Sequence, residues 1–461
     1  MPTLDAVLSA IDADLDASRE RLFDFLRIPS VSTDPAFTKE CRRAADWLAD
    51  QLKGLGYSAE VRTTPGHPIV VGHAAAKRKD APHVLFYGHY DVQPPDPLEL
   101  WETGPFEPRL APGKEGMDIV ARGASDDKGQ LMTFVEACRA FEANGGLPCN
   151  VTFLFEGEEE TGSPSLPDFL AAHREELSQP GLALVCDTGM WNASTPGVTV
   201  MLRGLTQEEV TIKAASHDLH SGMFGGPIPN PIHILAKIVG ELHDADGRVA
   251  LPGFYDGVPE LPEDIAQQWR DLDFDEKAFL AGVGLTAPAG EAGRGVLEQI
   301  WARPTCDVNG IYGGYTGKGT KTVLPAQASA KVSFRLVGTQ SPKAVIDSFR
   351  AFVQARLPRD ATAEFVTHGA SGALQLPFGS EALSRARRAL QAEWGKEAAL
   401  TGCGGSIPIV GSFKKDLGMD SLMIGFALED DRIHSPNEKY SWTSFHKGTR
   451  SWARVLDALA G

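Results

Sequence analysis

Residues 83–91 read His-Val-Leu-Phe-Tyr-Gly-His-Tyr-Asp, an apolar run that ends in a histidine and an aspartate. A short apolar run of this length predicts a strand that is buried on both faces. Two further apolar runs, residues 150–155 and 182–186, are likewise followed directly by acidic residues, and residues 131–141 have the spacing of a helix. Strands that alternate with helices indicate an α/β fold whose mostly parallel sheet is flanked by helices.

The pattern of predicted strands and helices changes near residue 200 and returns to the first pattern near residue 374. Strand-like runs at 198–215 and 330–337, with a helical segment at 342–357, are typical of a smaller α+β domain with an antiparallel sheet. The 461 residues also exceed the length at which a single core stops growing. We therefore predict a larger domain formed by residues 1–199 and 374–461, and a second domain, residues 200–373, inserted into it.

Composition and charge restrict the class of partner. The net charge of −17 argues against nucleic acid or an anionic membrane surface as a partner. No apolar run approaches the roughly 18 residues that a membrane span needs, and the first residues do not have the pattern of a secretory signal. The six cysteines lie far apart without a Cys-x-x-Cys pair, which favours reduced thiols. We expect a cytoplasmic protein that binds neither nucleic acid nor membrane.

Acidic and histidine residues follow the predicted strands at the point where each strand ends. His89 and Asp91 follow the first strand, a run of glutamates from residue 156 to 160 follows the second, and Asp187 follows the third. In open α/β sheets, ligand sites lie outside the carboxyl ends of the strands. A single histidine is often structural and an acidic run is often a solvated face. Their shared position at strand ends favours a common site.

Two further candidates lie outside the strand ends. Asp126 and Asp127 open a predicted helix after the turn-prone residues 122–125, and His434 lies in the polar segment 432–438. Histidine, aspartate and glutamate ligands that are scattered along a chain suit a catalytic metal rather than a compact zinc finger. The residues alone do not fix the number of metal ions.

Five motifs follow one another along the chain. They are Gly-His-Tyr-Asp-Val at 88–92, Arg-Gly-Ala-Ser-Asp-Asp-Lys-Gly at 122–129, Glu-Gly-Glu-Glu-Glu-Thr-Gly-Ser at 156–163, Cys-Asp at 186–187 and Ile-His-Ser-Pro-Asn-Glu at 433–438. Their order and separation resemble the aminoacylase/glutamate-carboxypeptidase family of dinuclear zinc hydrolases, and the resemblance covers nearly the whole chain.

A second group of motifs lies in the inserted segment and after it. They are Asp-Leu-His-Ser-Gly at 218–222, Lys-Thr-Val-Leu-Pro at 321–325, Ser-Phe-Arg-Leu-Val at 333–337 and Gly-Gly-Ser-Ile-Pro at 404–408. These motifs are similar to those of the carnosinase-like dipeptidases within the family. The chain departs from that branch at Gly338, where proline is common, but the preceding arginine is in place.

The resemblance implies two Zn²⁺ ions per subunit, for which Mn²⁺ or Co²⁺ could substitute. One ion would be held by His89 and Asp187. The other would be held by Glu160 and His434, and Asp126 would bridge the two.

The resemblance also implies roles for two acidic residues that do not bind metal. Asp91 would orient the ring of His89, and Glu159 would be the general base. Two Zn²⁺ ions, three ligand carboxylates and a bridging hydroxide are about neutral together, which a partly buried site tolerates. A fourth carboxylate ligand would exceed neutrality, so this count favours a Glu159 that is free to move protons. The peptide bond between Asp126 and Asp127 is expected to be cis.

Four residues outside the metal site are implied as substrate contacts. His220 would stabilise the oxyanion that develops on the scissile carbonyl, and Arg335 would bind the terminal carboxylate of the substrate through its planar fork. Thr322 and Ser406 would make lesser contacts. Two local alternatives stay open, because His220 could cap a loop and Arg335 could form a surface ion pair.

The combined prediction is a metal-dependent peptidase that hydrolyses dipeptides or very short peptides with a bridging water and a glutamate base. An N-acyl-amino-acid deacylase or an exo-carboxypeptidase would use the same metal site. A metal-stabilised binding protein without turnover is a further alternative. Such a protein is expected to lack the base or the orienting acid, but Glu159 and Asp91 are both present. The implied metal ligands place the catalytic, metal-binding domain in residues 1–199 and 374–461. In this family the inserted domain commonly pairs two subunits, so we expect residues 200–373 to form a lid and dimerisation domain of a homodimer.

Overall fold

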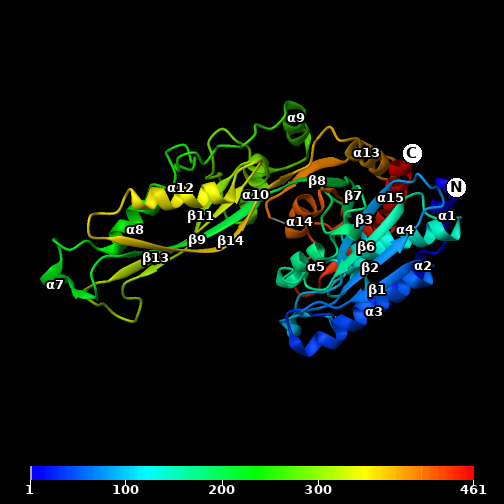
Figure 1. Ribbon diagram of the computed structural model, residues 1–461, viewed down its shortest axis with the longest axis horizontal. Coiled ribbons are helices and arrows are strands. Elements are labelled where there is room, and N and C mark those ends of the chain that lie inside the picture. The colour runs from blue at the N-terminus through cyan, green and yellow to red at the C-terminus, as the bar shows by residue number, and fades with distance from the viewer. Residues whose placement is uncertain (1–2, 406) are drawn as a thin grey trace. The chain divides into compact units, whose positions relative to one another are not determined.

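The computed structural model of the chain describes residues 3–405 and 407–461. Within these residues the chain forms two compact units (Figure 1). Unit 1 comprises Met1–Val200, Leu376–Thr401 and Pro408–Gly461, and unit 2 comprises Met201–Gln375 and the short segment Gly402–Ile407. Both units are therefore assembled from segments that lie far apart in the sequence.

A mixed β-sheet forms the centre of unit 1, in the order β1-β2-β6-β3-β7-β17-β8, with β16 also paired to β8. The neighbours β6, β3, β7 and β17 run parallel, whereas the pairs β1–β2, β2–β6 and β17–β8 are antiparallel. The predicted α/β class is confirmed, with parallel strands at the centre and antiparallel strands at the edges. The strands are β1 Ser58–Arg62, β2 Ile69–Ala74, β3 His83–His89, β6 Asn150–Glu156, β7 Leu182–Val185, β8 Gly197–Leu202, β16 Ala399–Cys403 and β17 Asp420–Met423.

Helices cover both faces of this sheet because successive side chains of a strand point to opposite faces. The Phe86 ring of β3 stacks on Phe134 of α4 at a centroid distance of 3.7 Å and meets Trp452 of α15 edge-on at 5.7 Å. The next residue, Tyr87, meets Phe413 of α14 edge-on at 5.8 Å. The helices of unit 1 are α1 Leu4–Ala13, α2 Leu15–Leu26, α3 Thr38–Gly54, α4 Lys128–Ala143, α5 Leu166–Ala172, α6 Arg174–Leu177, α13 Glu381–Trp394, α14 Pro408–Leu417 and α15 Trp442–Ala460, with 3₁₀ turns at Pro35–Phe37, Leu98–Leu100 and Glu159–Thr161.

A second, three-stranded antiparallel sheet in unit 1 has the order β18-β5-β4. It consists of β4 Arg109–Gly113, β5 Gly116–Val120 and β18 Lys439–Ser441. Lys439 pairs with Val120 in register. This pairing brings the segment after β5 next to the segment before β18, and each of these segments carries a predicted metal ligand.

Unit 2 contains a four-stranded antiparallel sheet in the order β11-β13-β9-β14. Helices α8 and α12 cover one face, where residues such as Ile212 and Phe334 form a buried core. The separate strands β10 and β12 also pair antiparallel. An antiparallel sheet with helices on one face confirms the predicted α+β character. The elements are β9 Gly204–Lys213, β10 Leu219–His220, β11 Thr305–Gly313, β12 Val323–Leu324, β13 Gln327–Leu336, β14 Thr362–Ser371, β15 Leu374–Gln375, α7 Ser221–Phe224, α8 Pro231–Gly240, α9 Glu263–Asp271, α10 Glu276–Gly282, α11 Val296–Trp301 and α12 Pro342–Gln354.

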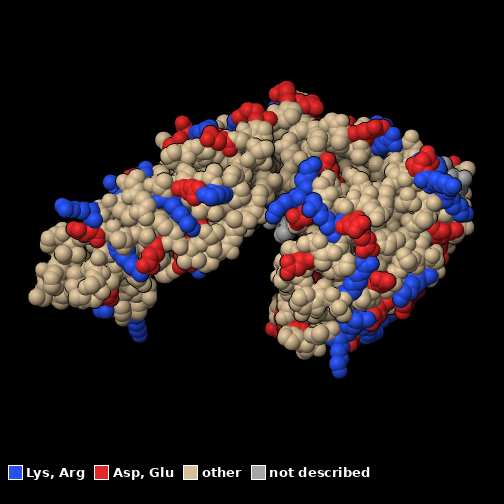
Figure 2. Space-filling view, in the orientation of Figure 1, with Lys and Arg blue, Asp and Glu red and all other residues tan. Residues whose placement is uncertain are grey.

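The surface carries both signs of charge. Figure 2 shows acidic and basic side chains interspersed on the visible face of each unit, although the net charge of the chain is −17. No helix of the described residues combines the length and the apolar character that crossing a membrane requires.

Candidate active site

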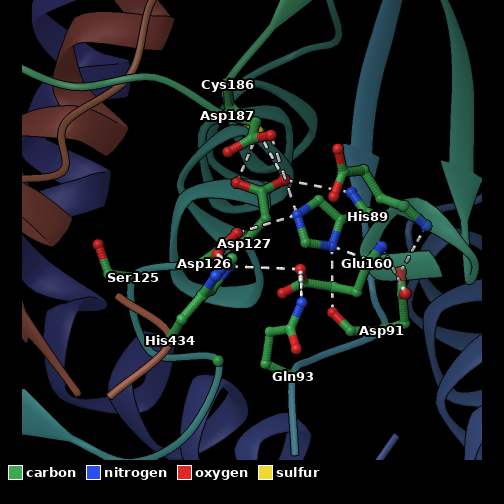
Figure 3. Close-up of polar contacts among 12 residues, drawn as sticks. His89, Asp91, Gln93, Ser125, Asp126, Asp127, Glu160, Cys186, Asp187 and His434 are labelled. Atoms are coloured by element: carbon green, nitrogen blue, oxygen red, sulfur yellow. Dashed lines mark hydrogen bonds and ion pairs between the residues drawn. The ribbon is translucent and has the colours of Figure 1, made fainter. Parts of the chain in front are cut away.

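The parallel strands of unit 1 bring histidine and acidic side chains to one edge of the sheet (Figure 3). His89 is the last residue of β3 and pairs in register with Glu156, the last residue of β6. Asp187 follows β7 by two residues. Because these strands are parallel, their carboxyl ends lie at the same edge. The structure therefore confirms that the predicted strand ends meet.

Two groups of possible metal ligands share Asp126. In the first group, His89 Nε2 lies 3.0 Å from Asp126 Oδ1 and 4.0 Å from Asp187 Oδ2. In the second group, His434 Nε2 lies 3.0 Å from Asp126 Oδ2 and 3.3 Å from Glu160 Oε2. The ligand atoms of each group all lie within 4.8 Å of one another. Asp126 thus offers one carboxylate oxygen to each group, and its peptide bond to Asp127 is cis, as expected.

The donor set of both groups fits divalent cations such as Zn²⁺. Imidazole nitrogens and carboxylate oxygens are the ligands that zinc takes in catalytic sites. The Oε1 atom of Glu160 is buried and has no hydrogen-bond partner among the described residues, and a buried carboxylate oxygen is costly without one. Three carboxylates converge here with only two histidines, so added positive charge would stabilise the cluster.

The pKa values of the cluster reflect this crowding of charge. Burial raises the pKa of Asp187 well above its ordinary value, and the nearby carboxylate of Asp126 adds to the rise. Burial acts on Asp126 in the same way, but hydrogen bonds with His434 and His89 outweigh it and hold the pKa of Asp126 below its ordinary value. Hydrogen bonds to Asp126 and Glu160 raise the pKa of His434 to about 10. The bridging position of Asp126 therefore favours positive charge on both of its sides.

Asp91 lies behind His89, where the sequence predicts an orienting group. It is fully buried, and its carbonyl oxygen and Oδ1 lie 3.1 Å and 3.4 Å from His89 Nδ1. Its carboxylate also accepts hydrogen bonds from the backbone N–H groups of Glu159, at 3.2 Å, and Glu160, at 3.1 Å. Ser32 Oγ donates a further bond to it at 2.6 Å. Asp91 therefore fixes both the ring of His89 and the turn that carries the predicted base.

Glu159 begins a 3₁₀ turn directly after β6. Its carboxylate has no hydrogen bond or ion pair with the described residues, unlike that of Glu160, which accepts a bond from Gln93 Nε2 at 2.7 Å. Burial raises the pKa of Glu159, and the neighbouring Glu160 and Asp126 carboxylates add to the rise. An unpaired carboxyl group whose pKa is raised above its ordinary value suits proton transfer.

Gln93 was not predicted as a residue of the site, and Asp127 was a candidate to which no role was assigned. Gln93 contacts Glu160, and Asp127 Oδ2 accepts the backbone N–H of His89 at 3.1 Å and lies 3.3 Å from the Cys186 thiol. Both lie within or next to the quoted motifs, so motif membership is the only signal that could have found them. Their contacts depend on how separate loops meet in the fold.

His220 and Thr322 lie together in unit 2. His220 ends β10 opposite Val323 of β12, and the carbonyl oxygen of Thr322 accepts the N–H of Ser221 at 3.0 Å. His220 is exposed, and its Nδ1 accepts the N–H of Gly222 at 3.0 Å. The local capping contact considered from the sequence is therefore present, while Nε2 has no hydrogen bond with the described residues.

Arg335 lies near the end of β13 in the four-stranded sheet, whereas His220 pairs with β12, which lies just before the start of β13. Arg335 faces Leu205 of β9 and Thr305 of β11, and it forms no ion pair with any described residue, so the predicted alternative of a surface ion pair is not found there. Eight residues of β13 separate Arg335 from Gln327, which at the rise of an extended strand is about 26 Å. Ser406, the last predicted substrate contact, lies outside the described residues.

Comparison with known proteins agrees with this geometry. Residues 85–458 match the model of peptidase family M20/M25/M40. The Cys-Gly metallodipeptidase DUG1 of Candida albicans is 32% identical over 460 residues, which cover 95% of this chain and 93% of that protein.

Two solved structures share the fold over nearly their whole length. Human carnosine dipeptidase 1 is 26% identical with a TM-score of 0.76, and the match covers 100% of both chains. The M20 family metallo-carboxypeptidase Sso-CP2 of Sulfolobus solfataricus is 30% identical with a TM-score of 0.80, covering 96% of this chain and 99% of that one. The expected resemblance to carnosinase-like dipeptidases and the expectation of an enzyme are both confirmed, and the chain belongs to peptidase family M20/M25/M40.

Proposed function

We propose that this enzyme hydrolyses dipeptides or very short peptides with a pair of zinc ions, a bridging water and Glu159 as the general base. The observation that carries the proposal is the pair of ligand groups that share Asp126, with the unpaired carboxylate of Glu159 beside them. Mn²⁺ or Co²⁺ would suit the same oxygen and nitrogen donors.

Each residue of unit 1 has a defined task in this proposal. His89, Asp187, Glu160 and His434 would hold the ions, with Asp126 between them. When bound, such a pair supplies a polarised carbonyl and a water of lowered pKa. Glu159 takes the proton of the attacking water and later delivers it to the leaving amine. Asp91 keeps His89 and the Glu159 turn in position.

The substrate contacts favour a short peptide with a free carboxyl terminus. Arg335 has no carboxylate partner among the described residues, and its guanidinium suits a terminal carboxylate. The similar proteins include a Cys-Gly metallodipeptidase and a carnosine dipeptidase. A carboxypeptidase is also among them, so an exo-carboxypeptidase remains the second candidate, and an N-acyl-amino-acid deacylase would use the same metal site.

The positions of His220 and Arg335 support a homodimer. His220 pairs with β12 just before the start of β13, and Arg335 lies near the end of β13. A dipeptide is far shorter than the roughly 26 Å that β13 spans between its start and Arg335. One substrate therefore cannot contact both residues of one chain. A second copy that contributes its His220 to the site resolves this, with residues 200–373 as the lid and dimerisation domain.

A cytoplasmic location is part of the proposal. All six cysteines are free, which fits a reducing compartment. Neither nucleic acid nor membrane has a role in the proposed reaction.

A substrate panel on the zinc-loaded enzyme tests this function. It contains Cys-Gly, β-Ala-His, longer peptides and N-acetyl amino acids, with a chelator-treated sample as the control. We expect the highest kcat/KM for the dipeptides and loss of turnover after chelation. Preference for longer peptides would favour the carboxypeptidase, and turnover of the acetylated compounds alone would favour the deacylase.

A further inference from the structure

Two loops of unit 1 carry the metal ligands Asp126 and His434. The first loop, residues 121–127, follows β5, and the second, residues 431–438, precedes β18. Glu438 ends the second loop and is fully buried. It belongs to the motif that supplies His434, but the mechanism above gives it no task.

The Glu438 carboxylate is saturated with hydrogen bonds from the first loop. Its Oε1 accepts the backbone N–H groups of Ser125, at 2.9 Å, and Asp126, at 3.0 Å. Its Oε2 accepts the N–H of Gly123 at 2.9 Å and Nη1 of Arg122 at 2.7 Å. Such charge-assisted bonds are stronger than neutral ones, so one side chain fixes the backbone of the residue that both ligand groups share.

The second loop needs such support because its backbone is strained. Arg432, His434 and Asn437 have φ values of 56°, 62° and 60°, a region that residues other than glycine rarely adopt. Conformations of this kind persist only where the surroundings enforce them. Glu438 lies directly after Asn437, so its bonds to the first loop anchor one end of the strained segment.

A second carboxylate fastens the other end of the same segment. Asp431 Oδ2 accepts Ser125 Oγ at 2.7 Å and the N–H of Leu428 at 2.8 Å. The strained turn with His434 is thus held at both ends against the loop that carries Asp126. Figure 3 shows Ser125, Asp126 and His434 on these neighbouring segments.

We propose that Glu438 is a positioning residue for the whole metal centre: it holds Asp126 and the turn of His434 in register, so that both metal positions depend on one carboxylate that binds neither ion. This inference rests on the proposed function only in assuming that metal binds at the two ligand groups. Arg122 is the counter-charge that lets the carboxylate remain buried.

The test compares zinc binding by wild type, Glu438→Gln and Glu136→Gln in zinc buffers, with bound zinc measured by elemental analysis. Glu136 is the matched control, since it is also buried and bonded to arginine, through Arg21 and Arg139, but contacts neither loop. In Glu438→Gln, one carboxylate oxygen is replaced by an NH₂ group, which cannot accept hydrogen bonds from the backbone N–H groups of the first loop. We expect the affinity of this variant for both ions to fall about 10–100-fold, the usual effect of losing a partner that orients ligands.

The result expected for Glu136→Gln is wild-type zinc affinity. The melting temperature without metal separates this effect from a general loss of stability. Wild-type affinity in folded Glu438→Gln would overturn the inference, and so would an equal loss in the control. If Glu438→Gln does not fold, Glu438→Asp is measured instead. Its shorter side chain keeps the negative charge but cannot reach the first loop. Wild-type zinc affinity of Glu438→Asp would also overturn the inference. Failure of the wild type to bind zinc would instead refute the proposed function.

Discussion

The functional residues of unit 1 and those of unit 2 are held in different ways. In unit 1, His89 and Asp91 are fully buried, and the Asp91 carboxylate accepts three hydrogen bonds. In unit 2, His220 is exposed and bonded only through Nδ1, and Arg335 forms no ion pair with the described residues. The candidate metal ligands are thus held in place by contacts within unit 1, whereas the described residues give Nε2 of His220 no hydrogen-bond partner and Arg335 no ion-pair partner.

The largest expected effect is in unit 1. Glu159→Gln keeps the shape of the side chain but cannot accept a proton, so kcat should fall about 10²–10⁴-fold. The zinc content should not change, because Glu159 is not a ligand in either group. Steady-state kinetics and elemental analysis check both parts. The exposed Glu175 of α6 is the control position, and full activity of Glu159→Gln would remove the base from the mechanism.

The next effect concerns the exposed histidine of unit 2. His220→Ala should lower kcat about 10²–10³-fold if His220 stabilises the oxyanion. His217→Ala serves as the control, since His217 is exposed and bonds only to Ser216.

Mixing variants distinguishes a histidine of the same chain from one of a second copy. A hybrid dimer of the His220→Ala and Glu159→Gln chains has one complete site only if His220 acts across subunits. After random exchange, half of the dimers are hybrids, and each hybrid has one complete site out of two. The mixture should then recover about a quarter of the wild-type activity. No recovery after verified exchange would place His220 in its own chain's site.

A smaller effect is expected at Arg335. Replacing the fork of two donors by a single ammonium in Arg335→Lys should raise KM about 10–100-fold for dipeptides, with a lesser change in kcat. Dipeptide amides lack the terminal carboxylate, so they should be poor substrates of wild type. Their KM should rise little further in Arg335→Lys. An equal loss for acids and amides would contradict carboxylate binding by Arg335.

The smallest effect concerns stability in unit 1. Glu156 is buried and accepts hydrogen bonds from Tyr87 and Ser163. Burial raises its pKa to about 8 from an ordinary value of 4.5, so the folded state binds this proton more tightly than the unfolded state. The stability that it contributes is present at low pH and declines as the pH rises through the window between these values.

Glu156→Gln should therefore remove part of this decline. Relative to wild type, the variant should gain about 4 kcal/mol in unfolding free energy between pH 5 and pH 8.5. Denaturant unfolding at the two pH values measures it. An equal pH dependence in both proteins would show that Glu156 ionises normally in the fold.

Much of the candidate metal site could be predicted because its residues lie at strand ends and in contiguous motifs. His89, Asp187 and Asp126 meet as expected, because apolar runs identify buried strands and the carboxyl ends of parallel strands share an edge. The direction of the outer strands could not be predicted, since the alternation of apolar and polar residues along a strand is the same in a parallel and in an antiparallel pair. The antiparallel β1 and β2 therefore make the sheet mixed.

The supporting contacts could not be predicted for a different reason. Glu438 bonds to residues more than 300 positions away, and Gln93 reaches Glu160 across a separate loop. Neither contact leaves a periodic or spacing signal, because each depends on the final packing of loops. The separation of His220 from Arg335 likewise follows only from the strand register of unit 2.

The central claim is that two cations bind on either side of Asp126. Anomalous diffraction from crystals of the zinc-loaded enzyme, at the zinc absorption edge, tests it most directly. We expect two peaks, one contacting His89 and Asp187 and the other contacting Glu160 and His434. A single peak, or peaks away from these side chains in crystals of fully active enzyme, would contradict it.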